Sequence, residues 1–396
     1  MNGAAFRRRD ASYPIGAAAS LEELDLDPHP LLARLREREP VSWLPALGGW
    51  LVTKRDLALQ AMRDSSVFTV DDPRFSTGQV VGPSMLTLDG AEHSRHRHAF
   101  AHPFRLDAVQ RFTTLVEGET ERLIDAIEPD GRAELRGSLA RPLAATVAAA
   151  AVGVEVADTA TILGWYDAIV AAVAGVAAGH PVSPAGREAF AALRSSIEQT
   201  THRAPGSALL PAAASQEHEL TCAEVVSNAA VLMFGGIETT EGMITNAIFH
   251  LLAHPEQRAL VDGDRGLLPN AIEESLRLEP AAAVIDRYAT ADARLGDASI
   301  DQGEFVSISI AGANRDPDFF SDPNRFDVLR ENVRHQIAFA RGSHVCLGMH
   351  LARLEAHAAI GRLLDRLPQL CLDPAHRTAP RGLVFRKPPA LHVVWD

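Results

Sequence analysis

The longest stretch of helical periodicity in the chain begins at Thr221 and runs to Ala253, just before Pro255. Thr221 followed three residues later by Glu224 is typical of a capping box, which marks the start of a helix. At about 1.5 Å per residue, such a helix is ~50 Å long. A helix of that length is expected to cross the whole folded body, so the remaining elements must pack around it.

The middle of this predicted helix is unusual because it holds two adjacent glycines, Gly235 and Gly236, followed by Glu238 and Thr239. Each glycine inside a helix costs about 1 kcal/mol relative to alanine. One explanation is close packing against another helix. The other is a flat ligand pressed on the bare backbone, with an acid and an alcohol beside it.

Periodicity along the rest of the chain indicates the fold class. Between about residues 90 and 280 apolar residues recur at helical spacing, whereas strand-like alternation is confined to short stretches near both ends. Trp43 and Trp50 flank a turn typical of a hairpin, and residues 306–310 and 391–395 are predicted to form further strands. The sequence therefore predicts a mainly α fold with small β-sheets.

Composition and charge exclude several classes of protein. The chain has 396 residues with 46% hydrophobic and 22% charged residues, which is ordinary globular composition. A formal net charge of -13 has the wrong sign for a general nucleic-acid binder. The charge-free apolar runs at 143–154 and 168–179 are shorter than the roughly 18 residues of a membrane span. We expect a cytoplasmic protein with neither a membrane anchor nor nucleic acid as a partner.

Three segments are predicted to be mobile. Residues 1–20 lie at the start of the chain and are predicted to form a flexible tail. The stretches 178–184 and 203–218 are rich in loop-forming residues and are predicted to be mobile connections.

One of the three cysteines lies in a glycine-rich loop. Cys346 stands between Phe339 and Gly348, directly before a helical pattern. The unpaired N–H groups at a helix start favour a thiolate, which is the form required of a nucleophile or a metal ligand. Cys222 and Cys371 lack such surroundings, and we interpret them as small hydrophobic residues of the core.

Two charged clusters complete the set of candidate sites. Glu274 and Arg277 lie three apart on a short predicted helix, and such a pair is by default an exposed one. His93 and Arg97 lie one helical turn apart, so both could face one anion, although a solvated charge run is the simpler reading. A weaker alternative is a zinc site formed by four nearby histidines, His93, His96, His98 and His102.

The order of these clusters along the chain resembles the cytochrome P450 family. The family's cysteine loop, Phe-x-x-Gly-x-His-x-Cys-x-Gly, is matched by five residues, Phe339, Gly342, His344, Cys346 and Gly348. Its Glu-x-x-Arg helix is matched by Glu274 and Arg277, and its acid–alcohol pair by Glu238 and Thr239. The resemblance begins near residue 20, so we expect residues 1–396 to form one domain with the P450 fold. Ala340 stands where a second glycine is usual, and Gly235 stands where alanine is common.

The resemblance implies a haem-thiolate monooxygenase that uses haem b, O2 and electrons derived from NAD(P)H. Cys346 would be the iron ligand. The residues that would contact the haem through side chain or backbone are His93, Arg97, Arg287, His344, Gly235, Gly236, Phe339 and Gly348. Thr239 and Glu238 would deliver protons, and Glu274 with Arg277 would be a buried structural pair.

The resemblance also implies a hydrophobic small-molecule substrate, plausibly of bacterial secondary metabolism, and electron supply from a separate ferredoxin and ferredoxin reductase. The expected substrate wall consists of Val81, Met85, Leu86, Phe234, Ile237, Val284, Ile285 and Phe385. Hydroxylation is the expected reaction, with ring coupling or desaturation as alternatives. Two other classes stay open: a non-catalytic haem carrier or sensor, and a hydrolase using Cys346 and His344.

Overall fold

The computed structural model describes residues 9, 11–154, 158–203 and 220–396. Its helices are α2 (Pro14–Ala18), α3 (Leu21–Leu26), α4 (His29–Arg38), α5 (Arg55–Arg63), α6 (Ser76–Val81), α7 (Gly90–Ala101), α8 (Thr113–Ile127), α9 (Arg141–Val152), α10 (Thr159–Ala177), α11 (Pro184–Arg203), α13 (Cys222–Ala253), α14 (Pro255–Gly263), α15 (Leu268–Leu278), α16 (Ile310–Ala313) and α17 (Met349–Arg366). Its strands are β1 (Val41–Leu44), β2 (Gly49–Val52), β3 (Phe68–Thr69), β4 (Arg132–Glu134), β5 (Val284–Ala289), β6 (Ala293–Leu295), β7 (Ala298–Ile300), β8 (Phe305–Ser309), β9 (Cys371–Leu372) and β10 (His392–Val394).

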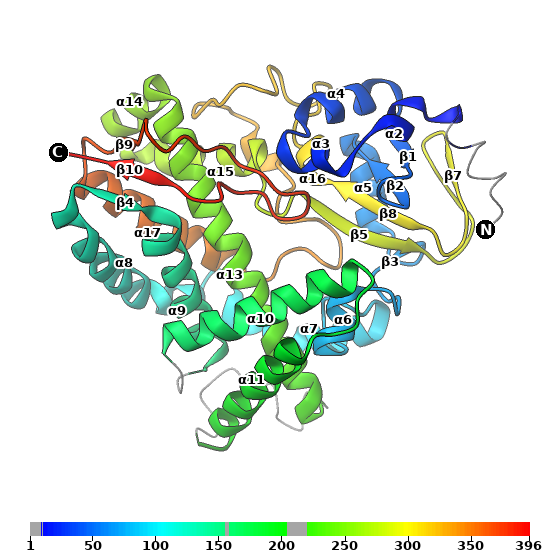
Figure 1. Ribbon diagram of the computed structural model, residues 1–396, viewed down its shortest axis with the longest axis horizontal. Helices are drawn as coiled ribbons and strands as arrows, with labels where there is room; N and C mark the ends of the chain where they lie inside the picture. The colour runs from blue at the N-terminus through cyan, green and yellow to red at the C-terminus, as the bar shows by residue number, and fades with distance from the viewer. Residues whose placement is uncertain (1–8, 10, 155–157, 204–219) are drawn as a thin grey trace.

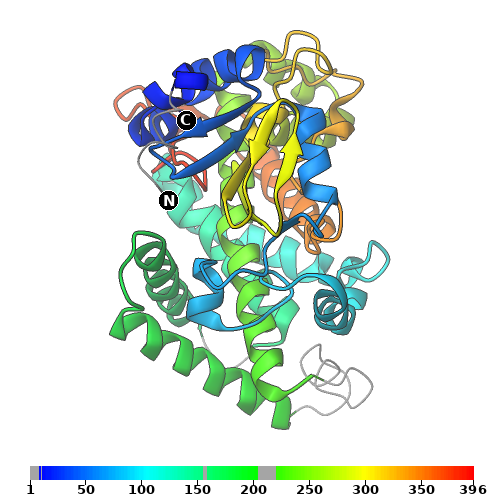
Figure 2. The same ribbon diagram turned by 90° about the vertical axis from the view of Figure 1, so that its right-hand side faces the viewer.

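Helix α13 crosses the molecule, as the sequence predicts (Figures 1 and 2). The Thr221 hydroxyl accepts the N–H of Glu224, and the Glu224 carboxylate in turn accepts the N–H of Thr221, so both halves of the capping box are present. Helices α9, α15 and α17 pack against α13. Most of α13 is therefore buried, and any site at its middle lies in the interior of the protein.

The predicted strands are confirmed and form small sheets. The largest has the strand order β1-β2-β8-β5-β3, in which Trp43 pairs with Trp50 across the hairpin and β8 runs parallel to β2. The predicted C-terminal strand is β10, which pairs with β4 and β9 in a second sheet. The β5–β8 pair matters for the site because β5 carries Arg287, on which the negative charge of Asp89 acts.

The prediction of a flexible tail over residues 1–20 is wrong for the part that is described, residue 9 and residues 11–20. Helix α2 begins where the buried Glu39 carboxylate accepts the backbone N–H groups of Ile15 and Gly16, at 2.8 and 3.0 Å. The Tyr13 ring also packs edge-on against Trp50. A buried carboxylate requires donors, and the helix start supplies them, so the segment is held in place.

The predicted connection at 178–184 joins α10 to α11, as expected, and its mobility stays a prediction. The other predicted connection, at 203–218, lies outside the described residues apart from its first residue.

Among the described helices, α10 is long and apolar enough to cross a membrane by length and composition alone, with a hydropathy of 1.6. A single helix of this kind is weak evidence for a membrane span, because the core helices of soluble proteins can have the same length and composition. In this fold α10 packs on α6, α9 and α11, and its Asp167 forms an ion pair with Arg141 of α9.

Candidate active site

The loop that carries Cys346 folds back on itself before α17 begins. The Cys346 N–H donates to the carbonyl oxygen of Phe339 at 2.8 Å, which closes the loop. Gly342 has φ +81°, and a Cβ there would lie 2.5 Å from the carbonyl oxygen of Met62, so only glycine fits. Ala340 also has a positive φ, 57°, which costs an alanine about 1–2 kcal/mol. The usual glycine at this position therefore has a physical reason, and this chain tolerates the strain.

Every residue from 338 to 350 is at least partly exposed, although Phe339 and Leu347 pack against the main hydrophobic core. The loop thus contacts the core without being fully buried in it, so a further group can pack against it. We call residues 338–350 the cysteine cradle.

Burial raises the pKa of the Cys346 thiol, and this effect is larger than those of the Gly348 and Met349 N–H groups and of Arg97 and Arg353, which lower the pKa. The start of α17 favours the thiolate as the sequence predicts, since its N–H groups lower the pKa, but burial has the larger effect in the absence of a metal ion. A coordinating metal ion removes that obstacle, because it keeps a thiol ligand deprotonated.

Cationic and N–H-bearing side chains gather beside the loop. The rings of His93 and His344 lie 4.3 Å apart between centroids, and His344 Nε2 lies 2.9 Å from the Asp89 carboxylate. Arg97 donates to the carbonyl oxygen of Val345 at 2.7 Å. His93, Arg97 and His344, which the family resemblance assigns to the haem, therefore lie together.

Arg287 completes this set from β5. It is buried, and the negative charge of Asp89 acts on it while burial lowers its pKa. Its guanidinium donates to the carbonyl oxygen of Asp286 at 2.7 Å.

His93 is buried, and its Nε2 atom has no hydrogen-bond partner among the described residues. A buried polar atom of this kind requires a partner, and an acceptor such as a carboxylate would supply it. Sequence reasoning missed Asp89, which lies just ahead of α7.

The two mid-helix glycines of α13 have different surroundings. A Cβ on Gly236 would lie 3.1 Å from the Cβ of Ala148 on α9, whereas a Cβ on Gly235 would meet nothing within 4 Å. Close helix packing therefore explains why position 236 is a glycine, and a contact between the Gly236 backbone and the haem stays a prediction. Gly235 borders open space. The Thr239 hydroxyl donates to the Gly235 carbonyl oxygen at 2.5 Å, so the alcohol lies on the same helical turn as this opening.

Glu238 is not a free carboxylate. Its Oε1 lies 2.6 Å from the Nζ of Lys387, which also lies 2.9 Å from Oε1 of the fully buried Glu241. Glu241 in turn pairs with Arg136, whose side chain is 26% exposed. The acid of the acid–alcohol pair is thus connected to the surface through alternating charges. Sequence reasoning missed Lys387 and Arg136 because they come from segments far from α13.

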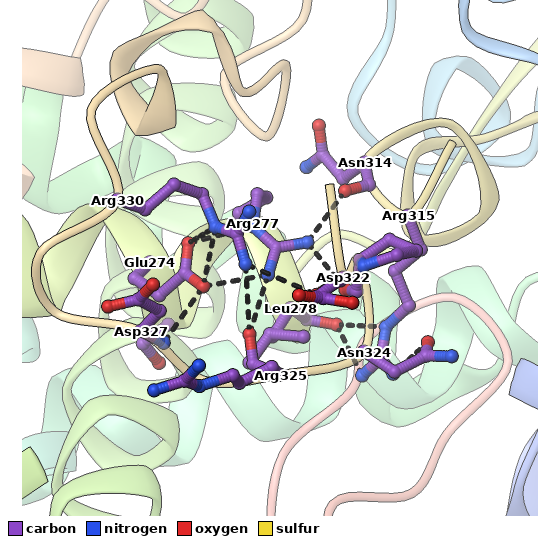
Figure 3. Close-up of polar contacts among 12 residues, drawn as sticks. Glu274, Arg277, Leu278, Asn314, Arg315, Asp322, Asn324, Arg325, Asp327 and Arg330 are labelled. Carbon is purple, nitrogen blue, oxygen red and sulfur yellow. Dashed lines mark hydrogen bonds and ion pairs between the residues drawn. The ribbon is translucent and has the colours of Figure 1, made fainter. Parts of the chain in front are cut away.

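The Glu274–Arg277 pair is buried, so the default reading of an exposed pair is wrong and the reading as a buried structural pair is confirmed. Both side chains have 0% exposure and form two parallel hydrogen bonds of 2.7 Å. Arg330 adds a further bond to Glu274 at 3.0 Å (Figure 3). The remaining Arg277 donors bond to three carbonyl oxygens, those of Asn314, Pro323 and Arg325.

The zinc alternative is wrong. His96 is buried in contacts with Asn228 and Glu224, at 2.9 and 3.2 Å, and does not converge with the other three histidines. Among the described residues, the one cluster that could hold a metal ion is Glu92, His96 and Glu224, and Arg95 donates to both of its carboxylates.

A small apolar cavity lies between α10, α11 and α13. Its lining residues are Ile162, Trp165, Tyr166, Ile169, Leu193, Met233, Phe234 and Ile237. Phe234 and Ile237 are the two predicted substrate contacts that line it, and sequence reasoning missed the others individually.

The other predicted wall residues lie elsewhere. Val81 and Met85 are buried, and their backbones bond to Ser227 and Asn228 of α13. Leu86 and Phe385 are exposed, whereas Val284 and Ile285 of β5 are half-buried.

Comparisons with known proteins agree with this geometry. The family model for cytochrome P450 matches residues 263–392. The chain is 34% identical to cytochrome P450 monooxygenase PikC of Streptomyces venezuelae, over 92% of this chain and 89% of the relative. It is 31% identical to 6-deoxyerythronolide B hydroxylase of Saccharopolyspora erythraea, over 86% of this chain and 88% of the relative. The structure of CYP109E1 from Bacillus megaterium with testosterone superposes with a TM-score of 0.86 at 25% identity, covering 96% of this chain and 100% of that one.

The fold and the relatives define a haem-thiolate monooxygenase. This chain belongs to the cytochrome P450 family. Its cofactor is therefore haem, and its electrons come from NAD(P)H through a partner.

The residues present fit that cofactor. The cysteine loop offers a sulfur and, beside it, a buried and unpartnered nitrogen on His93, while Gly235 presents bare helix backbone to open space. Haem carries two carboxylates, and Arg97 and Arg287 are cations of the kind that hold such groups.

Proposed function

We propose that Cys346 is the iron ligand of haem b and that the chain oxidises an apolar small molecule at the open face of α13 beside Gly235 and Thr239. The observation that carries this proposal is the convergence of His93, Arg97 and Arg287 on the open cysteine loop, with the His93 nitrogen unpartnered. When bound, the haem supplies the activation of O2.

In this proposal the chain holds the haem carboxylates by charge-assisted hydrogen bonds from Arg97 and Arg287 and by His93. His344 is fixed by Asp89 and supports the His93 ring from one side. The backbone of Phe339 and Gly348 shapes the sulfur's surroundings, since the N–H of Gly348 is directed at the sulfur.

Thr239 and Glu238 have the proton-delivery role. The Thr239 hydroxyl is half-buried beside the open side of Gly235 and can exchange its bond to the Gly235 carbonyl for one to a water or to O2. Glu238 would replenish the proton, and Lys387 holds its carboxylate in place. A haem carrier or sensor needs no such relay, so the relay favours an enzyme.

The electron donor in this proposal is an acidic ferredoxin with its own reductase. Arg105, Arg111 and Arg334 are exposed near a cleft that Leu106, Arg334 and His350 help to line. Arg353 is not part of this docking face, because it pairs with Glu273 and stacks on Phe339 and so supports the loop. Exposed cations on a chain of net charge -13 would steer an acidic protein to this face. A ferredoxin reduced by NAD(P)H implies a cytoplasmic location.

A turnover assay tests the proposed function. Holoprotein is screened for ligands that shift the Soret band, and the hits are incubated with a ferredoxin, its reductase, NADPH and isotopically labelled O2. We expect a product that carries one labelled oxygen atom. An oxidised product that carries no labelled oxygen would instead indicate ring coupling or desaturation. Ligand shifts without any product would indicate a carrier or sensor.

The same assay tests the docking face. Arg105→Glu with Arg334→Glu is expected to slow electron transfer at low salt and to flatten its salt dependence. An unchanged rate and salt dependence would contradict the docking site.

A further inference from the structure

The ion pair between Glu273 of α15 and Arg353 of α17 lies behind the cysteine cradle and has no chemical role in the proposed function. Arg353 Nε lies 2.5 Å from Glu273 Oε1, and its Nη2 lies 3.1 Å from Oε2. Two parallel bonds of this kind fix the plane of a guanidinium. The Glu273 side chain is 5% exposed and that of Arg353 is 33% exposed. A buried acid therefore holds a cation that lies only partly in solvent.

The pair places the Arg353 guanidinium on the ring of Phe339, where the cysteine motif begins. The guanidinium carbon lies 4.5 Å from the ring centre, a distance at which a cation and an aromatic face attract each other. The carbonyl oxygen of Phe339 accepts the N–H of Cys346 at 2.8 Å. Arg353 therefore stacks on the residue that closes the loop onto Cys346.

Glu273 also bonds to the residues that lead into the cradle. Its Oε2 accepts a hydrogen bond from Nε2 of Gln336 at 3.0 Å, and Oε1 of Gln336 accepts the N–H of Ala338 at 2.5 Å. One buried carboxylate thus holds Arg353 directly and the first residue of the cradle through Gln336. This arrangement fixes the cation relative to the loop, which a steady electrostatic effect on the loop requires.

The positive charge of Arg353 acts on several groups of the loop. Burial, and after it the charge of Arg353, lowers the pKa values of His350 and Arg341. Burial raises the pKa of the Cys346 thiol, and Arg97 and Arg353 are the cations that act against this effect. In the proposed function Arg97 holds a haem carboxylate, which offsets its charge. Arg353 is then the cation that remains to stabilise negative charge on the sulfur.

We propose that Glu273 is a positioning residue that holds Arg353 against Phe339, and that the Arg353 charge makes the haem iron easier to reduce. Reduction adds one negative charge to the iron and its sulfur ligand, and a nearby cation stabilises that charge. The pair therefore raises the reduction potential that the electron donor meets. The proposal rests on the proposed function, since it takes Cys346 as the iron ligand.

The test is a spectroelectrochemical titration of the holoprotein without substrate. It compares the wild type with Arg353→Gln, Arg353→Lys, Glu273→Gln and the double variant that combines Glu273→Gln with Arg353→Gln. The matched control is Arg122→Gln. Arg122 forms the same two parallel bonds with Glu119, at 2.8 and 2.6 Å, but its side chain is 62% exposed on α8.

At a fixed applied potential, Arg353→Gln is expected to lower the ratio of reduced to oxidised haem about three- to tenfold. A tenfold change corresponds to about 59 mV for one electron. Arg353→Lys keeps the charge and should recover most of the wild-type ratio. Glu273→Gln should raise the ratio, because it removes the negative charge that offsets Arg353. The double variant should lie between the two single variants, and Arg122→Gln should match the wild type.

Shifts of the same sign in Arg353→Gln and Glu273→Gln would overturn the proposal, because loss of packing at the loop would explain both. An unchanged ratio in Arg353→Gln, or an equal loss in Arg353→Lys, would overturn it as well. If Arg353→Gln binds no haem, the sign of the shift in Glu273→Gln still decides, and a lowered or unchanged ratio there counts against the pair.

The carbon monoxide spectrum of each reduced protein separates this failure from that of the proposed function. A thiolate-type band in the wild type, together with any of the contrary results, refutes the role of the Glu273–Arg353 pair alone. A missing band in the wild type refutes the haem assignment instead.

Discussion

Replacing Glu274 with glutamine is expected to lower the free energy of unfolding by about 3–5 kcal/mol and to give protein poor in haem. Glutamine has nearly the same shape but no charge. It therefore leaves Arg277 and Arg330 buried without their shared counter-ion (Figure 3). Arg277 also holds three backbone carbonyl oxygens of the segment that leads into the cysteine loop. Loss of the pair should thus loosen the cradle as well as the fold.

Urea unfolding and the ratio of haem to protein measure this effect. Glu198→Gln is the matched control, because Glu198 pairs with Arg194 on the surface at 3.9 Å with both side chains about half exposed. That variant should change stability by less than about 0.5 kcal/mol. Equal midpoints and full haem content in Glu274→Gln and Glu198→Gln would show that the buried pair has no structural role.

Replacing Thr239 with alanine is expected to uncouple the reaction while leaving the protein folded. General acid catalysis by a positioned group contributes about 10²–10⁴-fold, and water can replace part of it. Product formed per NAD(P)H consumed should therefore fall by about tenfold or more. The reducing equivalents should appear instead as hydrogen peroxide, because O2 that has taken up two electrons and two protons leaves before its O–O bond is cleaved. Haem content and ligand-induced Soret shifts should match the wild type, since the Thr239 side chain bonds only to the Gly235 carbonyl in the contacts we describe.

The neighbouring residue provides the control for this prediction. Thr240 has the same chemistry but is 2% exposed, whereas Thr239 is half-buried beside the opening at Gly235. Thr240→Ala should stay coupled, and Thr239→Ser should restore most of the product. Tight coupling in Thr239→Ala would mean that another group delivers the protons.

The parts of the structure that local sequence patterns specify were predicted well. The capping box of Thr221 and Glu224, together with helical periodicity, located α13 to within a residue at each end. The hairpin at Trp43 and Trp50 likewise follows from turn residues between strand formers. In both cases the signal lies within the element itself.

The parts that long-range contacts determine were not predicted. Arg330, Lys387 and Asp89 each come from a segment distant in sequence from the residue that they hold, so no local spacing reveals them. The order of residues 11–20 depends on Glu39, which is buried only because the helix start of α2 covers it. Gly235 and Gly236 could not be told apart from the sequence, because only the position of α9 decides which of the two is packed.

The central claim is that Cys346 binds the haem iron as a thiolate. The most direct measurement is the carbon monoxide difference spectrum of the reduced holoprotein for wild type, Cys346→Ser, Cys222→Ser and Cys371→Ser. Cys222 and Cys371 are both exposed, so their interpretation as core residues is wrong. We expect the red-shifted Soret band of thiolate ligation in the wild type, in Cys222→Ser and in Cys371→Ser, and its loss in Cys346→Ser alone. A band that survives in Cys346→Ser, or that disappears in Cys222→Ser or Cys371→Ser, would contradict the account.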